Sequence, residues 1–179
     1  IPEILRLFPK DELDMKAASS PGAGRPGGPP VYLQGTEYGV QTGPLLSPLG
    51  APCTEPPWTT LIAVDLDKGI IKWEVPLGTI EKFAPFGLPL KLGAPAYGGP
   101  IVTAGGLIFI GATHDEKFRA FDIDTGNKLW EVDIPRSANS MPMSYEIDGR
   151  QYVVTVAAGH QFLDRQEVTD HIVAYALPE

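Results

Sequence analysis

The feature that most restricts the fold of this chain is an internal repeat. Residues 63–75 align with residues 120–132 at an offset of 57 positions, and seven of the thirteen aligned positions are identical. The shared residues are Ala63, Asp65, Asp67, Gly69, Trp73, Glu74 and Val75, which recur as Ala120, Asp122, Asp124, Gly126, Trp130, Glu131 and Val132. Such self-similarity means that one structural unit occurs at least twice.

Each copy of the repeat has the pattern of a β-hairpin. The alternating segments LIAVDL and FRAFDI are each followed by an Asp-x-Gly turn and a second apolar segment, IIKWEV or KLWEV. Glycine at the turn permits positive φ, and the aspartate before it can accept hydrogen bonds from turn amides. We expect two equivalent hairpins whose tryptophans dock between neighbouring sheets.

Further strands are expected around the second hairpin. Residues 100–113 contain two, interrupted at Ala104-Gly105-Gly106, and residues 151–157 and 171–176 contain one each. About four strands per repeat of this length indicates the blades of a β-propeller in an all-β chain. Two blades cannot close a ring, so we expect residues 59–179 to be the end of a larger propeller.

Composition supports turns and short strands in place of helices. Gly 20 and Pro 19 together exceed a fifth of the 179 residues, while 43% hydrophobic residues suffice for a core. We divide the chain into an N-terminal extension and linker, residues 1–35, and propeller blades with ring closure, residues 36–179. Within this scheme residues 1–15 form a short surface helix, 17–30 a Pro/Gly-rich linker or exposed loop, and 31–57 an irregular surface segment.

Charge and cysteine content exclude some functions. A net charge of −8 with no basic run disfavours nucleic acid as a partner. No apolar stretch is long enough to span a bilayer, so any membrane anchor is expected outside this chain. Cys53, the single cysteine, rules out an internal disulfide and is interpreted as a small buried side chain, with a reactive thiol as the alternative.

Three segments outside the repeat resemble one enzyme family. They are residues 36–58 (TEYGVQTGPLLSPLGAPCTEPPW), 92–122 (LGAPAYGGPIVTAGGLIFIGATHDEKFRAFD) and 142–160 (PMSYEIDGRQYVVTVAAGH). With the ending IVAYALP, they are similar to the C-terminal third of membrane-bound glucose and quinate/shikimate quinoprotein dehydrogenases. The repeat itself, A-x-D-x-x-x-G-x-x-x-W, resembles the tryptophan-docking motif of propeller quinoproteins. The resemblance covers residues 36–178, and residues 1–32 have no comparable counterpart.

The resemblance implies an eight-bladed propeller that binds pyrroloquinoline quinone (PQQ) and a Ca²⁺ or Mg²⁺ ion. It implies oxidation of a sugar, polyol or cyclitol in the periplasm, with electrons passing to ubiquinone at the membrane. The catalytic base and most metal ligands would lie in an N-terminal propeller portion, without which this chain is inactive. The alternative function is a non-catalytic propeller scaffold, like the lipoproteins that assist outer-membrane protein assembly.

Four residues are candidates for the site on the strength of this resemblance. Asp115 would face the quinone as a catalytic residue, with Arg119 as its ion-pair partner, although a structural role at the strand turn is the alternative. Tyr97 and Gly98 would contact the cofactor, the glycine by letting the backbone approach a planar ring. His160 would contact substrate, with a hydrogen-bonded structural histidine as the alternative. No metal ligand is assigned.

Two features near these candidates carry further expectations. His114 is interpreted as a solvated loop residue. Residues 137–144, SANSMPMS, depart from the Gly-Gln-Ala-Thr-Pro-Met-Thr pattern of glucose enzymes, and residues 161–170 also differ from the glycine-rich counterpart. These departures indicate a substrate other than glucose.

Overall fold

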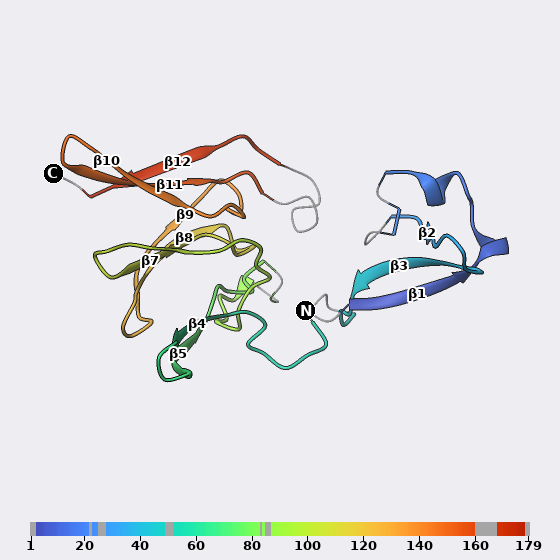
Figure 1. Ribbon diagram of the computed structural model, residues 1–179, viewed down its shortest axis with the longest axis horizontal. Coiled ribbons are helices and arrows are strands. Elements are labelled where there is room, and N and C mark those ends of the chain that lie inside the picture. Colours follow the sequence, from blue (N-terminus) through green and yellow to red (C-terminus); the bar gives the residue numbers. More distant parts are fainter. Residues whose placement is uncertain are drawn as a thin grey trace. The chain divides into compact units, whose positions relative to one another are not determined.

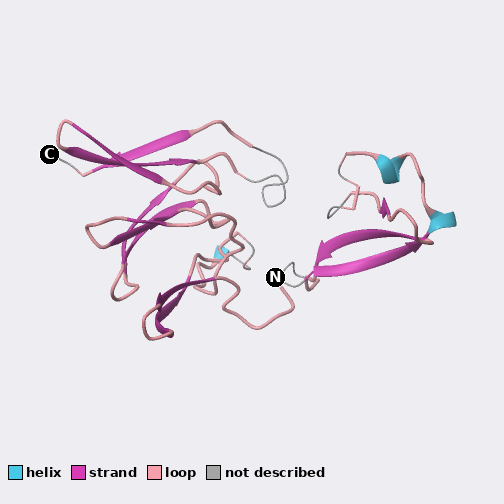
Figure 2. Cartoon of the chain, viewed as in Figure 1, coloured by secondary structure: helices cyan, strands magenta, loops and turns pink. Residues whose placement is uncertain are grey.

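The chain consists of two compact units, Ile1–Glu55 and Pro56–Glu179. The computed structural model describes residues 3–21, 23–24, 28–48, 52–82, 84, 87–159 and 168–177. Strands and loops make up nearly all of this part of the chain, and its helical segments are short 3₁₀ turns, including Lys10–Glu12 and Ala17–Ser19 (Figure 2). The all-β class predicted from the sequence is confirmed.

The first unit is built on a three-stranded antiparallel sheet in the order β1-β3-β2. Its strands are β1 (Glu3–Pro9), β2 (Val31–Tyr32) and β3 (Tyr38–Pro44). The prediction of a helix over residues 1–15 is wrong, because β1 pairs with β3 from Glu3 to Pro9. The irregular segment expected over residues 31–57 is likewise interrupted by β2 and β3, which supply partners for the backbone of β1.

The position of β3 also bears on the division of the chain. We placed the start of the propeller portion at residue 36, whereas β3 pairs with β1 and β2 inside the first unit. The compact units divide between Glu55 and Pro56. Pairing between strands distant in sequence therefore groups residues 38–44 with the N-terminal segment.

The second unit contains three antiparallel sheets in sequence order (Figure 1). The first sheet pairs β4 (Thr60–Asp65) with β5 (Ile70–Pro76). The second has the order β6-β7-β8-β9, with strands Ile101–Val102, Leu107–Ile110, Lys117–Asp122 and Lys128–Asp133. The third has the order β10-β11-β12, with strands Met143–Ile147, Arg150–Val156 and Ile172–Ala176. Neighbouring strands are neighbours in sequence, as in successive up-and-down sheets.

The two copies of the repeat form the same hairpin. Both hairpins, β4–β5 and β8–β9, have a register shift at the same place, after Ala63 and after Ala120. The turn glycines have φ of 63° and 72°. In each turn the preceding aspartate accepts main-chain N–H bonds, at 2.8–3.1 Å, from the second and third residues after it. The predicted equivalence of residues 63–75 and 120–132 is therefore confirmed.

The repeat tryptophans lie between successive sheets. The Trp73 indole nitrogen donates to the main-chain oxygen of Ile123 at 2.9 Å, and a Cβ at Gly126 would lie 2.7 Å from the Trp73 ring. Trp130 packs edge-on against Tyr175 of the third sheet, with ring centroids 5.1 Å apart. A glycine at 126 thus leaves space for an aromatic ring from the preceding sheet.

Two buried clusters fill the spaces between the sheets. The first comprises Leu61, Leu77, Ile108, Ile110, Ala112 and Phe121, and the second Phe118, Ile134, Ala138, Val153 and Ala157. Strand β8 contributes Phe121 to one cluster and Phe118 to the other, because alternating side chains point to opposite faces. The second sheet is therefore packed on both faces. Among the described residues no helix is long and apolar enough to cross a membrane.

Candidate functional site

A buried ion pair joins the loop after strand β7 to strand β8. The Arg119 guanidinium forms two hydrogen bonds with the Asp115 carboxylate, one of them 3.1 Å long from Nη1 to Oδ1. The side chains are 1% exposed for Asp115 and 3% for Arg119. The ion pair expected from the i, i+4 spacing is confirmed.

Donors from two sheets complete the surroundings of this carboxylate. The Thr113 hydroxyl donates to Asp115 Oδ1 at 2.5 Å, and the Thr79 main-chain N–H donates to Oδ2 at 2.8 Å. Thr79 follows β5, so the Asp115 side chain connects the first sheet to the second. Each carboxylate oxygen accepts at least two hydrogen bonds, which satisfies its acceptor capacity.

The arginine has further acceptors. Its Nε donates to Glu131 Oε2 at 2.7 Å, and its Nη1 also donates to Thr113 Oγ1 at 2.8 Å. In the other copy of the repeat Ile62 occupies the position of Arg119, at the same offset of 57 residues. The charged network therefore belongs to one hairpin only.

These contacts determine the protonation of Asp115. Burial raises the pKa of the Asp115 carboxyl, but the hydrogen bonds and positive charge of Arg119, with the Thr113 and Thr79 bonds, outweigh this effect and hold the pKa below its ordinary value. The group is ionised at neutral pH. The contacts describe a structural anchor between sheets, and a catalytic role for Asp115 stays a prediction.

Tyr97 and Gly98 form an exposed turn close to this network. The Tyr97 main-chain N–H donates to the oxygen of Ala112 at 3.0 Å, and the Tyr97 residue is 49% exposed. Gly98 has a φ of 115°, and a Cβ there would lie 2.6 Å from the main-chain oxygen of Asn139. The close approach that requires glycine is therefore to the chain itself, at residue 139.

Three segments meet at Ser137 and Asn139. Asn139 Nδ2 donates to Ser137 Oγ at 3.1 Å, and the main-chain N–H of Gly159 donates to the Ser137 oxygen at 3.0 Å. With Gly98 against Asn139, residues 97–98, 137–139 and 157–159 lie side by side. Sequence reasoning did not select Ser137 or Asn139, although the departure at residues 137–144 marked this segment.

The sequence also led to predictions for two histidines and the single cysteine. His160 lies outside the described residues, directly after Gly159. The interpretation of His114 as solvated is wrong, because its residue is 6% exposed and its main-chain N–H donates to the oxygen of Pro95. The buried interpretation of Cys53 is also wrong, since its side chain is exposed.

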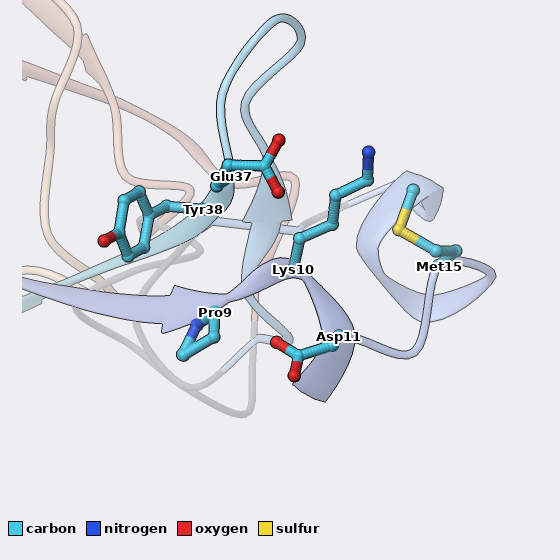
Figure 3. Close-up of a pocket in the computed structure, with 6 residues that line it drawn as sticks. All are labelled: Pro9, Lys10, Asp11, Met15, Glu37 and Tyr38. Carbon is cyan, nitrogen blue, oxygen red and sulfur yellow. The ribbon is translucent and has the colours of Figure 1, made fainter.

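Among the described candidate residues there is no group of metal ligands, and the best-defined pocket lies elsewhere in the chain. Within the described ranges no three His, Cys, Asp or Glu side chains are grouped to bind a metal. A pocket of about 650 Å³ lies in the first unit, lined by Pro9, Lys10, Asp11, Met15, Glu37 and Tyr38. Its charged side chains point in different directions (Figure 3), so it lacks the convergent polar groups of a typical binding site.

Comparison with protein families identifies the relationship. Residues 1–153 match the model of the PQQ family described as glucose/ethanol/alcohol dehydrogenase, beta-propeller domain. The chain belongs to this family. Because the match begins at residue 1, our statement that residues 1–32 have no counterpart is wrong. The recognition of a quinoprotein dehydrogenase family from the repeat and the three segments is confirmed.

Individual members of the PQQ family are similar over nearly the whole chain. Quinoprotein glucose dehydrogenase A of Acinetobacter calcoaceticus is 43% identical over 100% of the chain, and a probable quinate dehydrogenase (quinone) of Xanthomonas campestris pv. juglandis is 41% identical over 98%. The chain spans 22% and 23% of these two relatives. The solved quinohemoprotein alcohol dehydrogenase of Comamonas testosteroni has a TM-score of 0.52 at 20% identity, covering 96% of this chain and 22% of its own, which supports the shared fold.

Proposed function

We propose that this chain is part of a PQQ-dependent dehydrogenase that oxidises an alcohol group of a sugar, polyol or cyclitol. The observation that carries the proposal is the combination of the family match over residues 1–153 with 43% identity to a quinoprotein glucose dehydrogenase along the whole chain. Because the chain spans about a fifth of such relatives, the activity is assigned to a larger assembly.

The residues of the exposed turn fit a planar quinone. Tyr97 offers an accessible aromatic ring for stacking, and Gly98 allows the turn that carries this ring to lie directly against the main chain of Asn139. When bound, PQQ supplies the two-electron acceptor that the oxidation of an alcohol requires. This chain would orient the cofactor with Tyr97 and Gly98 and exclude water through the packed strand ends behind them.

The remaining catalytic groups are assigned to the rest of the protein. The described residues offer no group of three metal ligands, so the ligands of a Ca²⁺ or Mg²⁺ ion would come from the N-terminal propeller portion. The same portion would supply the base that accepts the hydroxyl proton. Asp115 contributes by holding the turn after β7 in place through Arg119 and Thr79.

The partner we propose is the N-terminal propeller portion of the same eight-bladed ring. On one face of the first sheet the apolar side chains of Ile62, Val64 and Ile71 are 45–58% exposed. A further blade packed on this sheet would bury them. The assembled enzyme would act in the periplasm, attached to the membrane through a part outside this chain, and would pass electrons to ubiquinone.

A non-catalytic scaffold is the competing function. Propeller packing requires the repeat tryptophans and their glycine, but it does not require an exposed Tyr97 beside Gly98. The two functions differ in whether PQQ binds. We expect the complete protein, reconstituted with PQQ and calcium, to reduce an artificial electron acceptor when given a sugar, polyol or cyclitol. Absence of turnover with every class, with the protein folded, would favour the scaffold.

A further inference from the structure

The amide of Asn139 lies at the junction of the three segments described above. Its main-chain oxygen is the atom closest to a Cβ built at Gly98, and its side chain contacts Ser137. Ser137 in turn holds the main chain at Gly159. Asn139 is therefore the point where the Tyr97–Gly98 turn meets the strand end at residues 157–159.

The Asn139 side chain has one unused acceptor. Its Nδ2 donates to Ser137 Oγ at 3.1 Å and to the Ser137 main-chain oxygen at 3.5 Å. A carbonyl oxygen can only accept, so this contact fixes the amide with Nδ2 towards Ser137. Oδ1 is shielded from solvent and has no hydrogen-bond partner among the residues that the structure describes.

A shielded acceptor without a donor is unfavourable, and such atoms in native proteins usually mark a missing partner. Gly98, whose backbone lies against the main-chain oxygen of Asn139, is exposed, and so is the neighbouring Tyr97. The exposed turn therefore lies beside the segment that carries the amide. Gly98 is followed by Gly99, so the backbone on this side has unusual freedom.

We propose that Asn139 is a specificity-determining residue that accepts a hydrogen bond from a hydroxyl group of the substrate through Oδ1. The inference rests on the proposed function. It names the protein group that would distinguish one alcohol substrate from another. A site built to pair with a hydroxyl rejects an analogue that lacks it at that position, because the buried acceptor is then unsatisfied.

The length of this side chain determines where a hydroxyl can reach the acceptor. Glutamine carries the same amide on a side chain one methylene longer than asparagine. A change from Asn to Gln at 139 therefore moves the acceptor without removing it.

Three variants of the complete protein, reconstituted with PQQ and calcium, test this assignment. Asn139→Gln moves the amide outward by one methylene, Asn139→Leu removes the acceptor, and Met143→Leu serves as an exposed control in the same segment. Steady-state KM and kcat are measured with glucose, glycerol and quinate, and PQQ affinity by titration of the cofactor.

We expect Asn139→Gln to change the ratio of kcat/KM between two of these substrates by about tenfold or more, and Asn139→Leu to raise KM by a similar factor for the preferred one. PQQ affinity and the control should stay within about twofold of the unchanged protein. Unaltered ratios in Asn139→Gln, or an equal loss for all substrates together with lost PQQ binding, would overturn the assignment. If the unchanged protein oxidises none of the substrates, the proposed function fails instead.

Discussion

The indole nitrogen of Trp73 donates a hydrogen bond of 2.9 Å to the main-chain oxygen of Ile123, fifty residues further along the chain. The bond joins the first sheet of the second unit to the second, and Gly126 makes room for the ring. In the second copy of the repeat the corresponding Trp130 packs against Tyr175 of the third sheet instead.

Trp73→Phe should therefore weaken the packing between the two sheets. The variant keeps an aromatic ring but leaves the Ile123 oxygen without its donor, which we expect to cost about 1–2 kcal/mol of unfolding free energy. Thermal unfolding of the complete protein measures the loss. Leu66→Ala, in the exposed turn of the same hairpin, is the control and should change stability by less than about 0.5 kcal/mol.

The repeat made the hairpins predictable, since the turn glycine, the preceding aspartate and the tryptophan each have a local reason for their place. The strand at Glu3–Pro9 was not predictable in this way. Its apolar residues Leu5 and Leu7 are exposed, and its conformation depends on pairing with β3 some thirty-five residues later. A mixed apolar and charged segment of that length has no pattern that distinguishes a helix from an edge strand.

The site was predictable to a similar extent. Arg119 could be paired with Asp115 from spacing alone, because the two lie across a tight strand connection. The Thr79 amide could not be predicted, since it comes from a loop 36 residues earlier. Asn139 was hidden for the same reason. Its contact with Gly98 depends on how two loops from different strands approach each other.

Breaking the ion pair between Asp115 and Arg119 should destabilise the protein strongly. Arg119→Met would leave a buried carboxylate without its cation, at a cost of about 3–5 kcal/mol. The double variant Asp115→Asn/Arg119→Met should recover part of this loss, because no buried charge remains. Chemical unfolding of the unchanged protein, of Arg119→Met, of Asp115→Asn and of the double variant measures the coupling. Losses that simply add would show that the two side chains do not act as a pair.

Stability should also depend on pH through Asp115. The pKa of this carboxyl in the folded protein lies below its ordinary value of 3.8, so the unfolded chain binds the proton more readily. The resulting stabilisation is complete above the ordinary value and is lost as pH falls through the folded value. Between pH 6 and pH 2 the free energy of unfolding should therefore fall more steeply in the unchanged protein than in Asp115→Asn. Parallel curves would show that Asp115 is not the group responsible.

Gly98→Ala tests the close approach of the exposed turn to Asn139. An added Cβ would lie 2.6 Å from the Asn139 oxygen, so the turn must shift and PQQ affinity should fall about tenfold or more. Gly149→Ala is a matched control, with a positive φ of 77° but no atom within 4 Å of the new Cβ. Equal PQQ affinities for the two variants and the unchanged protein would show that the turn does not contribute to cofactor binding.

His160→Asn tests the residue implied by resemblance alone. The change removes a charge that the imidazole can carry and retains a polar amide, so KM should shift by different factors for different sugars or polyols. PQQ binding should be preserved. A uniform decrease for all substrates, accompanied by loss of PQQ, would assign His160 to the cofactor or to the fold instead.

The most direct test of the central claim is a single-turnover measurement on the complete protein. The apoprotein is titrated with PQQ in the presence of calcium, and one equivalent of a sugar, polyol or cyclitol is then added while the absorbance of the cofactor is followed without any electron acceptor. We predict saturable binding of one PQQ and its reduction by at least one of these alcohols. A folded protein that binds no PQQ, or binds PQQ that no alcohol reduces, would contradict the assignment.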